Sequence, residues 1–110
     1  LPPAISIGLT EQICKSTNVK YQKIFFPFSR LVTAHLDHEI NGMIKLILDP
    51  NTDKILGAQV LGENAHELSS ILSISLNKNA TLQDLIDSLH LHPTYGEIFK
   101  ELGFSWILKK

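Results

Sequence analysis

Two residues near the end of the chain, His92 and Glu97, are of types that together perform acid–base chemistry. His92 stands directly before Pro93, and Glu97 follows the proline by four positions. A residue that precedes proline is disfavoured in helical conformation, so the imidazole is held off the following helix and can lie over its first turn, where the glutamate stands. A carboxylate bonded to one imidazole nitrogen leaves the other free to transfer a proton. The pair suits acid–base work but lacks a nucleophile, metal or cofactor nearby.

The same segment also fits a purely structural role. Thr94 and Glu97 have the spacing of a capping box, in which the threonine hydroxyl accepts from the Glu97 backbone N–H and the carboxylate accepts from the Thr94 N–H. In that case Pro93 only fixes the chain as it enters the helix, and His92 is an ordinary surface or boundary residue. The residues by themselves leave both interpretations open.

The five histidines raise the alternative of a metal site. His90 and His92, two apart, would share one face of a strand, and His35 and His38 could meet on a helix. Neither spacing is a strong metal signature, and the single cysteine, Cys14, does not accompany them. We therefore expect no metal, and ordinary surface or boundary positions for the histidines other than His92.

The composition is that of one globular domain. Of 110 residues, 44% are hydrophobic and 19% are charged, and the formal net charge is −1. This balance gives no electrostatic reason to expect nucleic acid or an anionic membrane as a partner, and no apolar run approaches the roughly 20 residues that cross a bilayer. One cysteine excludes a disulfide within the chain, so a reducing, cytoplasmic compartment is expected.

The first half of the chain has the pattern of β-strands. Apolar runs cover residues Ala4–Leu9, Val19–Phe28, Leu31–Leu36, Met43–Leu48 and Ile55–Leu61. The last two runs flank a loop rich in Asp, Pro and Asn, which predicts a β-hairpin. Because proline has no backbone N–H to donate, either the strand that contains Pro27 lies at the edge of a sheet or Pro27 stands at the end of that strand. Thr10 is expected to cap a short helix that runs to about Lys15.

The second half changes to helical spacing. The apolar positions that repeat at helical intervals are Ala65, Leu68, Ile71, Leu72 and Leu76. Asn79 is expected to end this helix in the left-handed conformation, Thr81 with Asp84 to begin a second helix, and Thr94–Leu102 to form a third. Strands followed by helices predict an α+β domain, with a mostly antiparallel sheet of about four to five strands packed by two to three C-terminal helices.

Three segments, in this order, resemble the C-terminal interface domain of the pyridine nucleotide-disulfide oxidoreductases, the flavoenzymes related to dihydrolipoamide dehydrogenase and glutathione reductase. Their sequences are SIGLTE at residues 6–11, GMIKLILDPNTDKILGAQVLGENAHEL at 42–68 and LHPTYGEIFKEL at 91–102. The last segment is similar to the His-Pro-Thr…Glu signature of that family. The resemblance covers nearly the whole chain.

The resemblance implies that residues 1–110 form a single dimerisation domain of a full-length FAD- and NAD(P)H-dependent disulfide oxidoreductase. It implies that His92 acts in the active site of the partner subunit, beside a redox-active cysteine pair and a flavin, that Glu97 orients it, and that the backbone at His92 and Pro93 approaches the flavin. The FAD and NAD(P) domains are absent from this chain, so alone it is expected to bind neither cofactor and to be inactive.

A close self-contact across a two-fold axis favours small residues. The resemblance therefore places Ala65, Ser69, Ser73 and Gly96 at the interface of a homodimer, where the alternative for the serines is contact with water. The implied enzyme is a cytoplasmic oxidoreductase of cell redox homeostasis that acts on a disulfide or dithiol substrate. The alternative function is a stand-alone dimerisation or protein-interaction module without catalysis.

Overall fold

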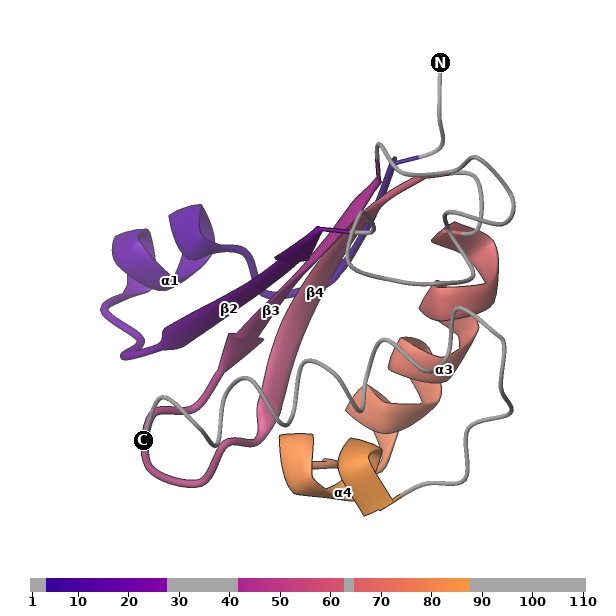
Figure 1. Cartoon of the computed structure of the whole chain (residues 1–110). Helices are drawn as coiled ribbons and strands as arrows, with labels where there is room; N and C mark the ends of the chain where they lie inside the picture. Colours follow the sequence, from indigo (N-terminus) through magenta and orange to yellow (C-terminus); the bar gives the residue numbers. More distant parts are fainter. Residues whose placement is uncertain (1–3, 28–41, 63–64, 88–110) are drawn as a thin grey trace.

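The structure is a computed structural model that describes residues 4–27, 42–62 and 65–87. Within them the chain forms a four-stranded antiparallel sheet and helices that pack on it (Figure 1). The strands are β1 (Ala4–Gly8), β2 (Gln22–Pro27), β3 (Met43–Leu48) and β4 (Ile55–Leu61), and the helices are α1 (Glu11–Thr17), α3 (Ala65–Asn77) and α4 (Leu82–Asp87). This arrangement confirms the predicted α+β fold class.

The strands of this sheet lie in the order β1-β4-β3-β2. β3 and β4 form the predicted hairpin, with the bounds that the sequence indicated. Asp49 stabilises its turn, because the carboxylate accepts hydrogen bonds from the backbone N–H groups of Asn51 (2.8 Å) and Thr52 (3.1 Å). These bonds lower the pKa of Asp49. Pro27 is the last residue of β2, an edge strand of the described sheet, as expected of a residue without a backbone N–H.

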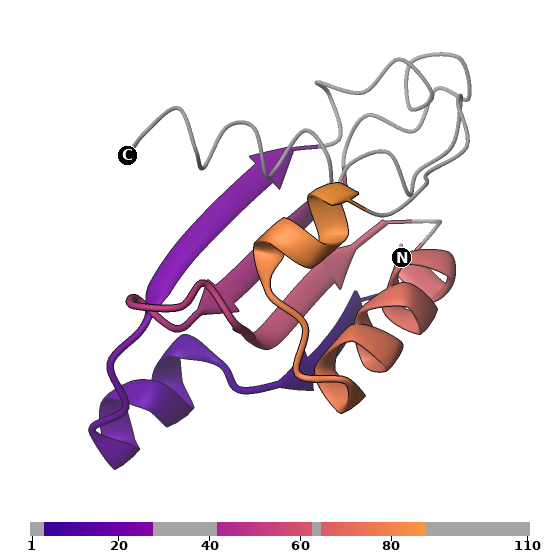
Figure 2. The ribbon, with the colours of Figure 1, turned by 90° about the horizontal axis from the view of Figure 1, so that it is seen from below.

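One face of the sheet carries the hydrophobic core, because alternate residues of each strand point to the same side. The buried core residues of the strands are Ile24, Phe26, Ile44, Leu46, Leu48, Ile55, Ala58 and Val60. Figures 1 and 2 both show α3 running alongside β1 and β4. The predicted apolar stripe of α3 faces this core: Ala65, Leu68 and Leu72 are buried, and Ile71 and Leu76 pack against it.

The opposite face of the sheet receives α1 (Figure 1). Thr10 caps this helix as predicted, since its hydroxyl oxygen accepts from the Ile13 backbone N–H at 3.1 Å. The chain reaches α1 by crossing close to β4, and a Cβ atom at Gly57 would collide there with the carbonyl oxygen of Leu9. Glycine at this position therefore allows the helix to approach the sheet.

Two of the predicted elements concern residues that the structure does not describe. They are the strand at Leu31–Leu36 and the helix at Thr94–Leu102. In the part that is described, no helix is long and apolar enough to cross a membrane.

Candidate functional site

The residues predicted to do chemistry, His92, Pro93 and Glu97, lie outside the described residues, and so does Gly96. Their roles stay predictions. The structure does describe α4, which precedes them in the chain and ends at Asp87. Of the contacts that could position this site, the structure therefore describes those that hold α4 in place.

The start of α4 is a reciprocal capping box, as the sequence predicted. The Asp84 backbone N–H donates to the Thr81 hydroxyl oxygen at 3.2 Å, and the Thr81 N–H donates to the Asp84 carboxylate at 2.8 Å. Such a box satisfies N–H groups that have no partner within the first helical turn. Just before it, Asn79 has the left-handed conformation (φ 55°) expected of a helix stop.

α4 is also tied to the turn between β3 and β4. The Ile55 N–H donates to the Ala80 carbonyl oxygen, and the Leu82 N–H donates to the Asp53 carbonyl oxygen, each at 2.9 Å. Leu82 and Leu85 are buried in the core. The central hairpin thus fixes the position of the helix that precedes His92.

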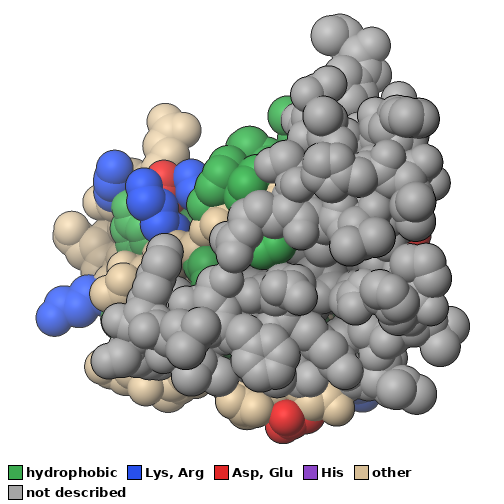
Figure 3. Space-filling view, viewed as in Figure 1, with side chains coloured by type: hydrophobic (Ala, Val, Ile, Leu, Met, Phe, Trp, Pro, Cys, Tyr) green, Lys and Arg blue, Asp and Glu red, His purple; other side chains and the backbone are tan. Residues whose placement is uncertain are grey.

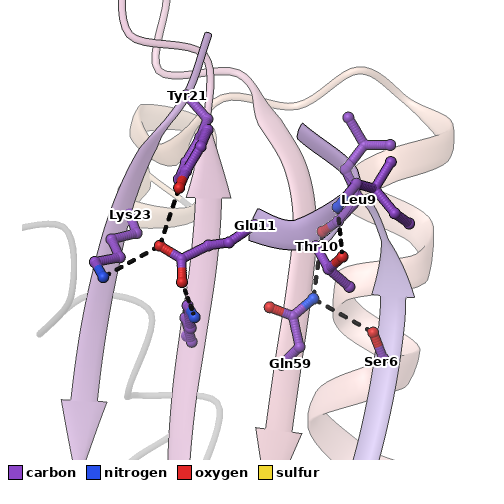
Figure 4. Close-up of polar contacts among 9 residues, drawn as sticks. Ser6, Leu9, Thr10, Glu11, Tyr21, Lys23 and Gln59 are labelled. Carbon is purple, nitrogen blue, oxygen red and sulfur yellow. Dashed lines mark hydrogen bonds and ion pairs between the residues drawn. The ribbon is translucent and has the colours of Figure 1, made fainter. Parts of the chain in front are cut away.

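On the other face of the sheet, Glu11 has a strongly perturbed pKa. Its carboxylate lies 2.6 Å from Lys45 Nζ and 3.1 Å from Lys23 Nζ, and it accepts a hydrogen bond from the Tyr21 hydroxyl at 3.3 Å (Figure 4). The hydrogen bonds from Lys45 and then Lys23 lower the pKa of Glu11 to about 2. A carboxylate held ionised in this way is a poor proton carrier near neutral pH. We assign to Glu11 and its partners Lys45, Lys23 and Tyr21 the role of joining α1 to the sheet.

α3 carries three of the four predicted interface residues, and they differ in exposure. Ala65 is fully buried in the core, so its side chain has no surface left for a second chain. Ser69 is partly buried and donates a hydrogen bond to the His66 carbonyl oxygen at 2.8 Å, whereas Ser73 is exposed. Their assignment to an interface stays a prediction.

The sequence analysis missed Ile74, the most exposed large hydrophobic residue among those described, at 64% exposure. Ile74 lies two positions after Leu72, which turns it to the side of α3 away from the core. Ser70 and Glu67, four and seven positions earlier, share this side and are also exposed. The signal was present in the sequence, because Ile74 falls out of phase with the buried stripe.

The described residues offer little to the metal alternative. In residues 4–27, 42–62 and 65–87, no group of three or more His, Cys, Asp or Glu side chains is placed to hold a metal ion. His66 is exposed on α3, and the other four histidines lie outside these ranges. Cys14 is a buried free cysteine of α1.

Sequence comparison places this geometry among known proteins. Residues 1–102 match the family model of the pyridine nucleotide-disulphide oxidoreductase dimerisation domain. The chain is 37% identical over 104 residues to the mitochondrial dihydrolipoyl dehydrogenase of Pisum sativum, covering 94% of this chain and 21% of that protein. It is 34% identical over 104 residues to the dihydrolipoamide dehydrogenase of Chaetomium thermophilum, with coverage of 94% and 21%. The chain thus spans about one fifth of the curated relatives it matches.

Structural comparison agrees with the sequence match. The fold superposes on the HOCl-induced flavoprotein disulfide reductase RclA from Escherichia coli with a TM-score of 0.86 at 25% identity. That superposition covers 94% of this chain and 24% of the reductase. The similarity therefore concerns one domain of a larger protein.

Proposed function

We propose that this chain, which belongs to the pyridine nucleotide-disulphide oxidoreductase dimerisation domain family, is the interface domain of a flavin-dependent, NAD(P)H-linked disulfide oxidoreductase. The observation that carries the proposal is the family match over residues 1–102, supported by relatives named dihydrolipoyl dehydrogenase. Because the chain spans about one fifth of those relatives, turnover belongs to a longer polypeptide. This chain contributes the His92–Glu97 pair and the contact between two subunits.

FAD and NAD(P)H would be held mainly by other parts of that polypeptide. Dinucleotides bind at the Gly-rich turn of a parallel βαβ unit, whereas the described sheet is antiparallel throughout. The described residues thus do not fit either cofactor, and the proposed contact of His92 and Pro93 with the flavin concerns backbone outside them. When bound, the flavin would exchange electrons with the redox-active disulfide.

His92 would move the protons that thiol–disulfide exchange requires. The attacking thiol must lose its proton, because the thiolate is the nucleophile, and the thiolate that leaves the disulfide must gain one. A neutral imidazole accepts the first proton, and the imidazolium returns it to the leaving sulfur, so one residue serves both steps. Glu97 would orient the ring and stabilise its protonated form.

Replacement of His92 by alanine in the complete polypeptide tests this role. General acid–base groups contribute about 100- to 10,000-fold to rate, so His92→Ala should slow thiol–disulfide exchange by that order and leave the flavin content unchanged. Glu97→Gln should have a smaller effect of the same kind. The matched control is His66→Ala, an exposed histidine on α3, which should retain full turnover. Near-normal turnover of His92→Ala would show that another group moves the proton.

For the homodimer, we propose the exposed side of α3 as the contact. A two-fold interface needs a surface that complements itself. The large Ile74 projects beside the small Ser70, while Glu67 near the start of the helix and Lys78 just past its end are both exposed. With two α3 helices antiparallel, Ile74 would lie beside the partner's Ser70 and Glu67 beside the partner's Lys78.

This arrangement refines the interface that the sequence indicated. Ser73 is exposed next to Ile74 and would remain within the contact, and Ser69 would lie at its border. Gly96 is proposed to lie close by. Ala65 would instead support the interface from inside, because it packs α3 onto the sheet.

We also propose a cytoplasmic location for the complete protein. A chain whose single cysteine is a free, buried thiol is compatible with a reducing compartment. Several relatives carry "mitochondrial" in their names, so the mitochondrial matrix is the competing location. Fractionation of cells that express the complete polypeptide would decide between them.

A further inference from the structure

Residues 53–55 and 79–82, here called the α4 joint, connect the β3–β4 turn to α4 and contain two residues with an uncommon backbone conformation. Asp53 has a φ of 59°, and Asn79 has a φ of 55°. A left-handed conformation costs most residues about 1–2 kcal/mol, and aspartate and asparagine are, after glycine, the residues that adopt it. Residues held in this way cluster at functional sites, so the joint is a candidate for a role beyond folding.

Asp53 directs its two backbone groups to different elements. Its N–H donates to the Asp49 carbonyl oxygen at 3.0 Å, which closes the turn, and its carbonyl oxygen accepts from the Leu82 N–H at 2.9 Å. The Leu82 N–H belongs to the first turn of α4, where backbone donors have no partner within the helix. The next residues, Lys54 and Thr81, pair as an antiparallel bridge. The left-handed conformation of Asp53 therefore couples closure of the hairpin to the start of α4.

α4 depends on these contacts for its position, because it has only six residues and an isolated helix shorter than about 12 residues is marginal in water. Leu82 and Leu85 bury its inner side in the core, while Asp84 and Asp87 are exposed on its outer side. Figure 3 shows acidic side chains at the lower edge of the molecule, where Figure 1 places α4. The core on one side and the α4 joint at its start thus set where the last residue, Asp87, lies.

We infer that the α4 joint positions His92 for proton transfer, with Asp53 as a positioning residue that acts through α4. The inference rests on the proposed function, in which His92 moves the protons of thiol–disulfide exchange. His92 follows Asp87 by five positions, so α4 is the described element nearest before it in the chain. A misplacement of about 1 Å in a reacting group can cost about 100-fold in rate, so a shift of α4 would reach the chemistry although Asp53 touches no substrate.

Isosteric substitutions of Asp53 separate this role from a purely structural one. Asparagine has the size of aspartate and tolerates a positive φ, whereas valine has a similar size but is branched at Cβ and is a severe outlier there. Hydrogen exchange of the Leu82 amide in the 110-residue chain reports on the joint itself. The amide should stay protected in Asp53→Asn and exchange rapidly in Asp53→Val. Protection in Asp53→Val would show that the conformation of Asp53 does not hold α4, and would overturn the inference.

Two rates measured on the complete polypeptide report on His92. NAD(P)H-dependent reduction of the disulfide substrate requires proton transfer, whereas reduction of ferricyanide takes single electrons and requires no thiol–disulfide exchange. The ratio of the first rate to the second is independent of the amount of active protein. Asp53→Val should lower this ratio by up to about 100-fold, through kcat and with little change in KM for the disulfide. Asp53→Asn should keep the ratio of the wild type.

Asn18→Val is the matched control. Asn18 has the same left-handed conformation (φ 59°) but ends α1, which has no part in the α4 joint. The substitution should lower the thermal midpoint and leave the ratio unchanged. If Asp53→Val also leaves the ratio unchanged, or if Asn18→Val lowers it equally, Asp53 contributes only to general stability and the inference is wrong.

Thr81→Ala provides a milder second measurement for the case that Asp53→Val does not fold. It removes the hydroxyl that caps α4, at a cost of about 1 kcal/mol, which is small beside the usual stability of a domain. The ratio should fall in Thr81→Ala and recover in Thr81→Ser. A complete polypeptide without flavin or disulfide reduction would refute both the proposed function and this inference. A ratio that falls in His92→Ala but not in Thr81→Ala or Asp53→Val would refute the positioning role alone.

Discussion

Replacing Ile74 by alanine measures the contribution of α3 to self-association. The side chain is 64% exposed, and full burial of an isoleucine is worth about 1.5–3 kcal/mol. Burying this exposed part in the dimer therefore contributes about 1–2 kcal/mol per chain. A two-fold contact uses Ile74 twice, which gives about 2–4 kcal/mol for the dimer. At about 1.4 kcal/mol per tenfold change, Ile74→Ala should raise the dissociation constant of the dimer roughly 30- to 700-fold.

Sedimentation equilibrium over a dilution series measures this constant. Ile13→Ala is the matched control, because Ile13 is also an exposed isoleucine but belongs to α1, and its dissociation constant should equal that of the wild type. The thermal midpoint of the monomer, followed by circular dichroism at high dilution, should be nearly the same for all three proteins. A dissociation constant for Ile74→Ala equal to that of the wild type would refute the assignment of α3 as the contact.

A charge exchange tests the antiparallel orientation separately. Glu67→Lys and Lys78→Glu should each weaken the dimer, because each would place like charges side by side in the proposed arrangement. Combined in one chain, the two substitutions should restore most of the affinity. If the combination is as weak as the single variants, Ile74 can still anchor the interface, but the helices do not pair in the antiparallel register.

Three further outcomes follow from the described contacts. Leu72→Ala should lower the free energy of unfolding by about 2–5 kcal/mol in urea titrations, because the side chain is fully buried; a smaller change would contradict the packing of α3. Thr81→Ala should lower the free energy of unfolding by about 1 kcal/mol and Thr81→Ser by much less, because only serine keeps the hydroxyl oxygen that accepts from the Asp84 backbone N–H. The pKa of Glu11 is lowered from 4.5 to about 2, so the pairing with Lys45 stabilises the fold above that range and is lost as pH falls through it. Glu11→Gln should therefore flatten the acid branch of stability against pH, and an unchanged branch would refute the pairing.

The elements that the sequence predicted best are those with local signals. The β3–β4 hairpin was placed correctly because two apolar runs flank a turn whose Asp49 bonds only to residues two and three positions away. Thr10, Asn79 and the Thr81–Asp84 box were recognised for the same reason, since each role depends on backbone within four residues. Such signals do not require knowledge of the fold.

The features that escaped prediction depend on which strands lie side by side. Glu11 and Lys45 are 34 positions apart, and only the placement of α1 on the sheet face opposite the core brings them together. The predicted strand from Val19 begins instead at Gln22, because Asn18 ends α1 in a left-handed turn and the chain needs several residues to enter the sheet. The exposure of Phe25 was equally hidden, since its neighbours Ile24 and Phe26 are buried.

The chemistry of the candidate site was inferred from resemblance and not from local pattern. His92, Pro93 and Glu97 fit a capped helix start as well as an acid–base pair, and the described residues fix only α4, which precedes them. Only the family similarity, which the match over residues 1–102 then established, favours the catalytic interpretation. A histidine acquires this role from groups on other parts of the protein, and a single domain sequence carries no local signal for them.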